Sequence, residues 1–167
     1  MQQKEEIINE EVVSETAEET AVESQEEVVE EKELTPAEKL SQLEAERMGS
    51  FKVTLSLEDA KYLRNMLDKT EYKGPQQAYL LVISKLEMSG VCETLNDLDK
   101  QQRHTVEISS ATIESLTFFM NNKVGKGVDS AQKLFSASMQ LRPAITQINE
   151  LDLKLESMRN ELSQESK

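Results

Sequence analysis

The sequence is poor in the residues that build catalytic and metal sites. It has one cysteine, one histidine, no tryptophan and only 4% aromatic residues over its 167 positions. A single cysteine cannot form a disulfide framework, and too few Cys and His side chains are present for a zinc site within one chain. The longest run of large apolar residues, Tyr79–Ile83, is too short to cross a bilayer. Because the N-terminal region is acidic and unlike a secretory signal, we expect a cytoplasmic protein that does not engage membranes.

Negative charge is concentrated at one end of the chain. Of the net charge of −13, residues 1–47 carry −12, from 16 glutamates and 4 basic residues. All phenylalanines and tyrosines lie after residue 47. Acidic, aromatic-free composition cannot offset the entropy of ordering, so we predict an acidic arm over residues 1–47, disordered at 1–33, followed by a folded core from residue 48. The excess of negative charge disfavours nucleic acid as a partner, because phosphates would be repelled.

A short helix is predicted at the end of the acidic segment, over residues 36–47. Thr35, Pro36 and Glu38 form the pattern of an N-cap, a first-turn proline and a capping-box glutamate. Leu40 and Leu43 share one face of this helix. The helix is shorter than an isolated helix needs to be for stability in water.

An internal repeat with an offset of 53 residues is the most informative feature of the sequence. Residues 53–88 align without a gap on residues 106–141, and hydrophobic positions are retained along the alignment. The seven identities are Val53/Val106, Ser56/Ser109, Leu63/Leu116, Lys73/Lys126, Gly74/Gly127, Ala78/Ala131 and Leu81/Leu134. This pattern predicts a duplication. Two unrelated helical hairpins that share only amphipathic periodicity are the alternative.

Each repeat unit is predicted to form a short strand and two helices joined by a turn. The alternating stretches 51–55 and 104–108 are typical of half-buried strands, and a serine follows each as an N-cap. Lys73-Gly74 and Lys126-Gly127 mark the turns between the helices. For the second helices we predict buried faces that carry Tyr79, Val82, Ile83 and Leu86 in one unit and Ala131, Leu134, Phe135 and Met139 in the other. The predicted fold is mainly α, with repeat 1 at 51–88, a linker at 89–104, repeat 2 at 105–141 and a separate helix at 142–167.

The last predicted helix carries a heptad pattern with alternating spacings of three and four residues. The seam consists of Leu141, Ala144, Ile148, Leu151, Leu155, Met158 and Leu162. Such a seam is typical of a coiled coil, so we predict self-association or docking on a partner helix. The alternative is that this helix folds back on the repeat domain.

No catalytic, metal or cofactor site is predicted. His104 is the only histidine and lies beside a predicted strand with no nucleophile marked near it. Cys92 has no second cysteine for a redox pair. The segment 96–99 resembles a calcium loop only at its start, since Arg103 and Ile108 fall where glycine and a bidentate glutamate are required. Residues 124–127 lack the other positions of a phosphate-binding loop.

Two resemblances follow from these residues. The strand, helix, glycine turn and helix of each unit resemble the ribbon-helix-helix DNA-binding fold, which implies that both strands pair into one ribbon. On that resemblance the DNA-facing positions are Lys52, Thr54, Ser56, Thr105 and Ser109, while Glu107 departs from the pattern because phosphate would repel it. The sequence Tyr72-Lys73-Gly74 with the flanking leucines is similar to short uncharacterised phage and bacterial proteins, which implies a phage or bacterial origin.

The resulting hypothesis is a non-catalytic interaction or assembly protein that binds a protein partner or copies of itself. It would be an adaptor, a scaffold-like protein or a virion-associated phage protein. No small-molecule substrate is evident. A tandem ribbon-helix-helix regulator, whose acidic segment is autoinhibitory, is the alternative.

Overall fold

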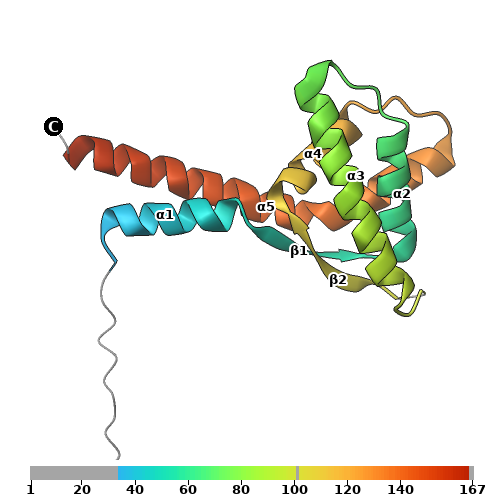
Figure 1. Cartoon of the computed structure of the whole chain (residues 1–167), viewed down its shortest axis with the longest axis horizontal. Coiled ribbons are helices and arrows are strands. Elements are labelled where there is room, and N and C mark those ends of the chain that lie inside the picture. Colours follow the sequence, from blue (N-terminus) through green and yellow to red (C-terminus); the bar gives the residue numbers. More distant parts are fainter. Residues whose placement is uncertain (1–33, 101, 166–167) are drawn as a thin grey trace, which may run out of the picture. The chain divides into compact units, whose positions relative to one another are not determined.

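The computed structural model describes residues 34–100 and 102–165, so the predicted disorder of residues 1–33 lies outside the described residues. The described residues form five helices and one two-stranded sheet (Figure 1). The elements are α1 (Pro36–Arg47), β1 (Ser50–Leu55), α2 (Leu57–Asp68), α3 (Gly74–Asn96), β2 (His104–Ser109), α4 (Ser110–Asn121) and α5 (Val128–Glu165). The prediction of a mainly helical fold is confirmed.

The two strands pair with each other in antiparallel register. Val53 lies opposite Val106, and the pairs on either side of them are Lys52 opposite Glu107 and Thr54 opposite Thr105. Because side chains alternate along a strand, Phe51, Val53 and Leu55 of β1 are buried while the residues between them are exposed. The sheet therefore contributes one apolar face to the core and leaves one polar face uncovered.

The short helices α2 and α4 follow the strands directly and begin in the same way. The Ser56 side chain accepts a hydrogen bond from the Asp59 backbone N–H, and the Ser109 side chain accepts one from Thr112. Each serine thus satisfies a backbone donor that the first turn of a helix leaves free. The buried faces of these helices meet beneath the sheet and carry Ala60, Leu63, Met66, Leu67, Ile113, Leu116, Phe119 and Met120.

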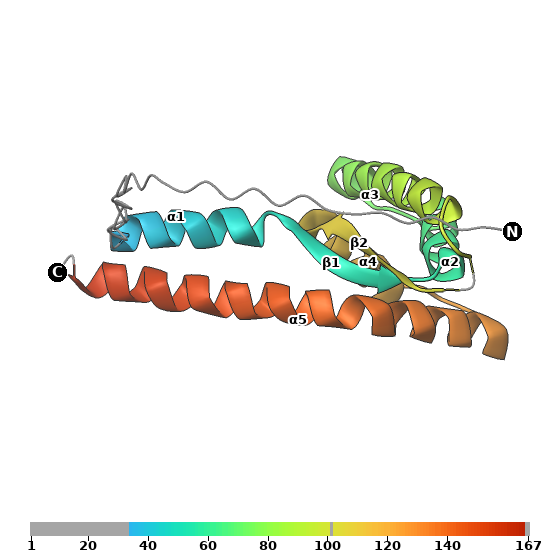
Figure 2. The same ribbon diagram turned by 90° about the horizontal axis from the view of Figure 1, so that it is seen from below.

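The long helices α3 and α5 each contact both short helices and the strand of the other half of the chain. Figure 2 shows α3 and α5 on opposite sides of the sheet and short helices. Gly74 is the first residue of α3, and Gly127 immediately precedes α5. Their φ values of 77° and 85° lie in the left-handed region, which glycine adopts without a Cβ clash. The strands, short helices and facing parts of α3 and α5 enclose the hydrophobic core.

Two boundaries differ from those predicted from the sequence. Helix α3 continues to Asn96, through the first half of the predicted linker. Helix α5 runs unbroken for 38 residues across the predicted boundary at 141/142, with Pro143 inside it. Leu141 and Ala144, on either side of Pro143, are buried in the core. This packing offsets the loss of the backbone hydrogen bond that a proline cannot donate.

Helix α1 has the predicted bounds but is not part of the buried core. Thr35 and Glu38 form the expected capping box, and Pro36 occupies the first turn. None of its residues is fully buried, although Leu43 packs against the edge of the core. In Figure 2, α1 lies along the C-terminal half of α5, and the two helices are in contact. We call α1 and residues 149–165 of α5 the helical arm.

Candidate interaction surfaces

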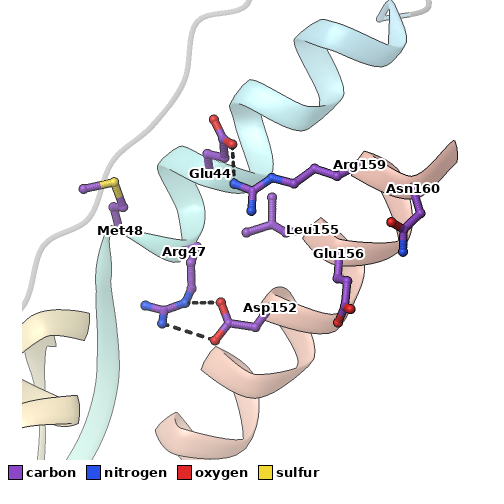
Figure 3. A pocket seen from close by; sticks show the side chains of 8 residues that line it. All are labelled: Glu44, Arg47, Met48, Asp152, Leu155, Glu156, Arg159 and Asn160. Atoms are coloured by element: carbon purple, nitrogen blue, oxygen red, sulfur yellow. Dashed lines mark hydrogen bonds and ion pairs between the residues drawn. The ribbon is translucent and has the colours of Figure 1, made fainter. Parts of the chain in front are cut away.

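The helical arm contains a hollow between α1 and α5 that is lined largely by charged side chains (Figure 3). Arg47 lines it, and its guanidinium donates two hydrogen bonds to Asp152, with N–O distances of 2.6 and 3.2 Å. It also donates to Glu114 of α4, at 2.5 Å. Further along the arm, Arg159 donates to Glu44 at 2.7 Å. These contacts run between the helices in antiparallel order.

Arg47 joins three helices through one side chain. Its side chain is only 17% exposed, whereas those of Asp152 and Glu114 are about half exposed. The hydrogen bonds to Asp152 and then to Glu114 raise the pKa of Arg47, so the guanidinium remains charged at any physiological pH. This role could not be predicted from the sequence, since nothing in the local pattern indicates that Arg47 contacts residues 67 and 105 positions further along the chain.

The predicted heptad seam is divided between the core and the arm. Leu141, Ala144, Ile148 and Leu151 belong to the core cluster of the same chain, and Leu155 is 5% exposed. Met158 and Leu162 are half-buried near the end of α5. In this structure the seam is therefore covered by the chain itself, as in the fold-back alternative.

The exposed face of the sheet holds three of the five predicted DNA-facing residues. Lys52, Thr54 and Thr105 are exposed there, and the hydroxyls of the two threonines lie 3.3 Å apart. Glu107 lies opposite Lys52 on the same face, so this face carries one positive and one negative charge. Such a balance provides little general attraction for phosphates.

The other two predicted DNA-facing residues cap helices. Ser56 donates to Asp59 while accepting from the Asp59 backbone. Ser109 donates from both its backbone N–H and its hydroxyl to Glu87 of α3, at 2.6 Å each. Their hydroxyls are already used within the chain, and the contact with Glu87 was not foreseen from the sequence.

The predicted turn residues Lys73, Gly74, Lys126 and Gly127 all lie at the starts of the long helices. All four are exposed. The two glycines share the same backbone conformation, which supports a structural role for both turns.

The predicted buried faces of the second helices are wrong. Tyr79, Val82 and Leu86 of α3 are 65, 54 and 68% exposed, and Phe135 and Met139 of α5 are 68 and 43% exposed. Of the other predicted positions, Ile83 and Leu134 are half-buried and Ala131 is exposed. The helices instead bury a face with small residues, Ser84 and Ala137, both 0% exposed. Small side chains allow close contact with the short helices, and this packing outweighed the local apolar pattern.

Two apolar surfaces are left exposed as a result. We define the α3 face as Tyr79, Val82 and Leu86, and the α5 face as Val128, Phe135 and Met139. Val82 and Phe135 are related by the repeat offset of 53 residues, as are Leu86 and Met139. Exposed apolar residues scattered singly are normal, whereas apolar residues that gather on one face are candidates for a contact surface.

The residues considered for chemistry have structural surroundings. A ring nitrogen of His104, Nε2, lies 2.8 Å from the Asp99 carbonyl oxygen. Cys92 is buried between helices, and this burial raises the pKa of its thiol. Among residues 34–100 and 102–165, no three His, Cys, Asp or Glu side chains cluster in a way that could hold a metal ion.

Comparisons with known proteins found no match, whether with protein-family models, with curated proteins or with solved structures. Within the described part of the chain, no helix combines the length and apolar character that crossing a membrane requires. The surfaces described above are therefore the basis for a functional interpretation.

Proposed function

We propose that this protein is a non-catalytic protein–protein interaction or assembly protein, built from two duplicated strand–helix–helix units. The observation that carries the proposal is the exposure of apolar side chains at repeat-related positions, Val82 with Phe135 and Leu86 with Met139. Leaving these side chains in water forgoes about 1.5–3 kcal/mol for each large side chain that a partner could bury. Two such faces on one chain suit a protein that connects partners.

Several features support the duplication. The short helices have 12 residues each, start at N-cap serines 53 residues apart, and are followed by glycines with matching φ. The strands pair about Val53 and Val106, which are also aligned by the repeat. A twofold relation between the units accounts for both the sequence offset and the pairing register.

The partner expected on the α5 face is a protein segment with apolar anchors and acidic flanks. Lys126 and Arg142 are exposed near the two ends of the α5 face, and Asp129 is the one acidic residue in the sequence between them. A helix-in-groove contact would bury the anchors while the acidic flanks face the basic side chains.

Affinity capture from the native host, with nuclease-treated and untreated eluates, tests the proposal. Wild type should retain a protein partner after nuclease, and Phe135→Glu should lose it, because a carboxylate would be desolvated in the contact. Leu153→Glu, at another exposed apolar position of α5 (67% exposed), is the matched control and should retain the partner. Equal capture by wild type and Phe135→Glu would exclude the α5 face as the contact.

DNA binding by a ribbon-helix-helix-like sheet is the second candidate function. It is favoured by the antiparallel pairing of two strands that expose Lys52, Thr54 and Thr105 on one face. Under this hypothesis short duplex DNA would elute from the untreated sample, and Lys52→Glu would abolish its binding. Under the interaction hypothesis, Lys52→Glu changes partner capture little.

A further inference from the structure

The contact between α1 and α5 in the helical arm has the features of a weak contact that another helix could replace. Helix α1 has no fully buried residue, and the side chains of the Arg159–Glu44 ion pair are 59 and 44% exposed. A 12-residue helix is marginal when isolated, and exposed ion pairs add little stability. The α5 seam beside α1 is by contrast apolar, with Leu155 buried and Met158 and Leu162 half-buried. Leu151, also buried, lies where the arm meets the core, near Glu46 of α1 and Phe51 of β1.

The charges beside this seam are complementary to a second α5 in antiparallel orientation. With the seam residues at heptad positions a and d, Asp152 and Arg159 occupy e positions, and Lys154 and Glu161 occupy g positions. An antiparallel pairing places Leu151 against Leu162 of the second copy and Leu155 against its Met158, so that each layer joins an a with a d position. The flanking positions then meet their own kind, e with e and g with g. Asp152 then faces Arg159 and Lys154 faces Glu161, and the twofold axis generates each pair twice.

A parallel arrangement lacks this complementarity. In parallel coiled coils a g residue faces the e residue five positions later on the other helix, which places Lys154 opposite Arg159. Like charges in these positions are destabilising. The charge pattern thus selects one orientation.

Helix α1 already satisfies the two e-position charges that such a second copy would satisfy. It runs antiparallel to α5, and its Arg47 and Glu44 satisfy Asp152 and Arg159, the e positions of the seam (Figure 3). Leu155 points into the space between these two ion pairs (Figure 3).

We infer that α1 is a displaceable cover, and that the surface beneath it is a self-association site for the same surface of a second copy in antiparallel orientation. Displacing α1 exposes Leu155, Met158 and Leu162, uncovers the α1 side of Leu151 and frees the charges of Asp152 and Arg159. The site lies on the helical arm and does not use the α3 or α5 faces. Its test is therefore independent of the partner-capture experiment.

Sedimentation equilibrium of the full chain at low salt tests the inference. A cover variant with reversed charges, Glu44→Arg and Arg47→Glu, makes α1 repel Arg159, Asp152 and Glu114. The charges on α5 that would pair between two copies are left unchanged. We expect wild type to remain largely at the monomer mass of 18.9 kDa and this cover variant to shift to twice that mass. Lys39→Glu, a charge reversal at another exposed position of α1, should sediment like wild type. A cover variant that stays monomeric would overturn the inference.

A charge swap on α5 then tests the orientation. In the cover variant, Lys154→Glu places a carboxylate opposite Glu161 of the other copy at both symmetric positions. The dissociation constant of the dimer should then rise at least tenfold. Adding Glu161→Lys restores complementarity and should restore the dimer. A parallel dimer would instead be strengthened by Lys154→Glu, because the introduced carboxylate would face Arg159, and this outcome would overturn the antiparallel assignment.

Folding of the cover variant is checked separately. Circular dichroism should show a cooperative unfolding transition close to that of wild type, because α1 lies outside the core. If the charge reversal disrupts folding, the milder pair Glu44→Ser and Arg47→Ser replaces it with the same expected shift in mass. An unchanged dimer fraction in that pair, with folding intact, would also contradict the inference. In a domain-swapped dimer, α1 of one copy would pack on α5 of the other and would need its native charges to do so. A dimer formed by the cover variant therefore excludes domain swapping.

Discussion

The core and the helical arm hold their helices together by different means. In the core, the side chains of α2 and α4 that face the sheet are almost wholly buried, with Leu63 and Leu116 both 0% exposed. In the arm, α1 contributes no fully buried residue and is joined to α5 by Arg47 and Arg159. Burial of apolar area is the main source of folding stability, whereas exposed ion pairs contribute little. We therefore expect the core to set global stability and the arm to open locally.

Removing a core side chain should have the largest effect. Leu116→Ala leaves a cavity among fully buried neighbours and should lower the free energy of unfolding by about 2–5 kcal/mol. Urea denaturation monitored by circular dichroism measures this change. Phe135→Ala, at a position 68% exposed, is the control and should stay within about 0.5 kcal/mol of wild type. A similar loss in both variants would show that the α5 face is part of the folded core.

Removing a helix cap in the core should have an intermediate effect. Ser109→Ala removes the hydroxyl that accepts from the Thr112 backbone and donates to Glu87. The expected loss is about 1–2 kcal/mol, from the cap and from a carboxylate left with one fewer donor. The double variant Ser109→Ala with Glu87→Ala measures the coupling of the two residues. Additive losses would contradict a direct contribution from this hydrogen bond.

The sequence predicted local features better than long-range ones. The strands, the N-cap serines, the glycine turns and the bounds of α1 follow from neighbouring residues, and the structure has them where predicted. The face that each long helix buries depends on the close contact made at Ser84 and Ala137, which no local apolar pattern encodes.

The candidate surfaces were accordingly predicted only in part. The heptad spacing identified the apolar residues of α5, but not that α1 would cover part of them. Arg47 and Glu87 form hydrogen bonds with residues far away in the sequence, so their roles depend on the tertiary structure. The exposed strand residues Lys52, Thr54 and Thr105 could be predicted because alternation along a strand fixes the face of each side chain.

Removing the central ion pairs of the arm should have a smaller and more local effect. Arg47→Ala removes the contacts with Asp152 and Glu114 and should cost about 1 kcal/mol, decreasing with added salt. Hydrogen exchange should become faster at the amides of α1 and stay unchanged in α2 and α4. Arg47→Lys should recover only part of the protection, because an ammonium group cannot form the bidentate contact. Faster exchange throughout the core would contradict the separation of arm and core.

The smallest expected effect is the response of the α1 cap to acid. Thr35 donates to Glu38 from its backbone N–H and its hydroxyl, at 2.8 Å each. The backbone hydrogen bond first, and the hydroxyl second, lower the pKa of the Glu38 carboxyl below its usual value. A lowered pKa means that the stabilisation is fully present above the pKa of the unfolded state and is lost as pH falls through the folded value.

Amide chemical shifts and exchange rates at the start of α1, followed during an acid titration, measure this loss of the cap. Protection of the first turn should decrease at acidic pH while the core amides are unaffected. Glu38→Gln keeps a side chain that can accept the same hydrogen bonds but does not titrate, so the first turn of this variant should lose its pH dependence. If the variant keeps the same acid response as wild type, another carboxylate, and not the Glu38 cap, controls the opening of the arm.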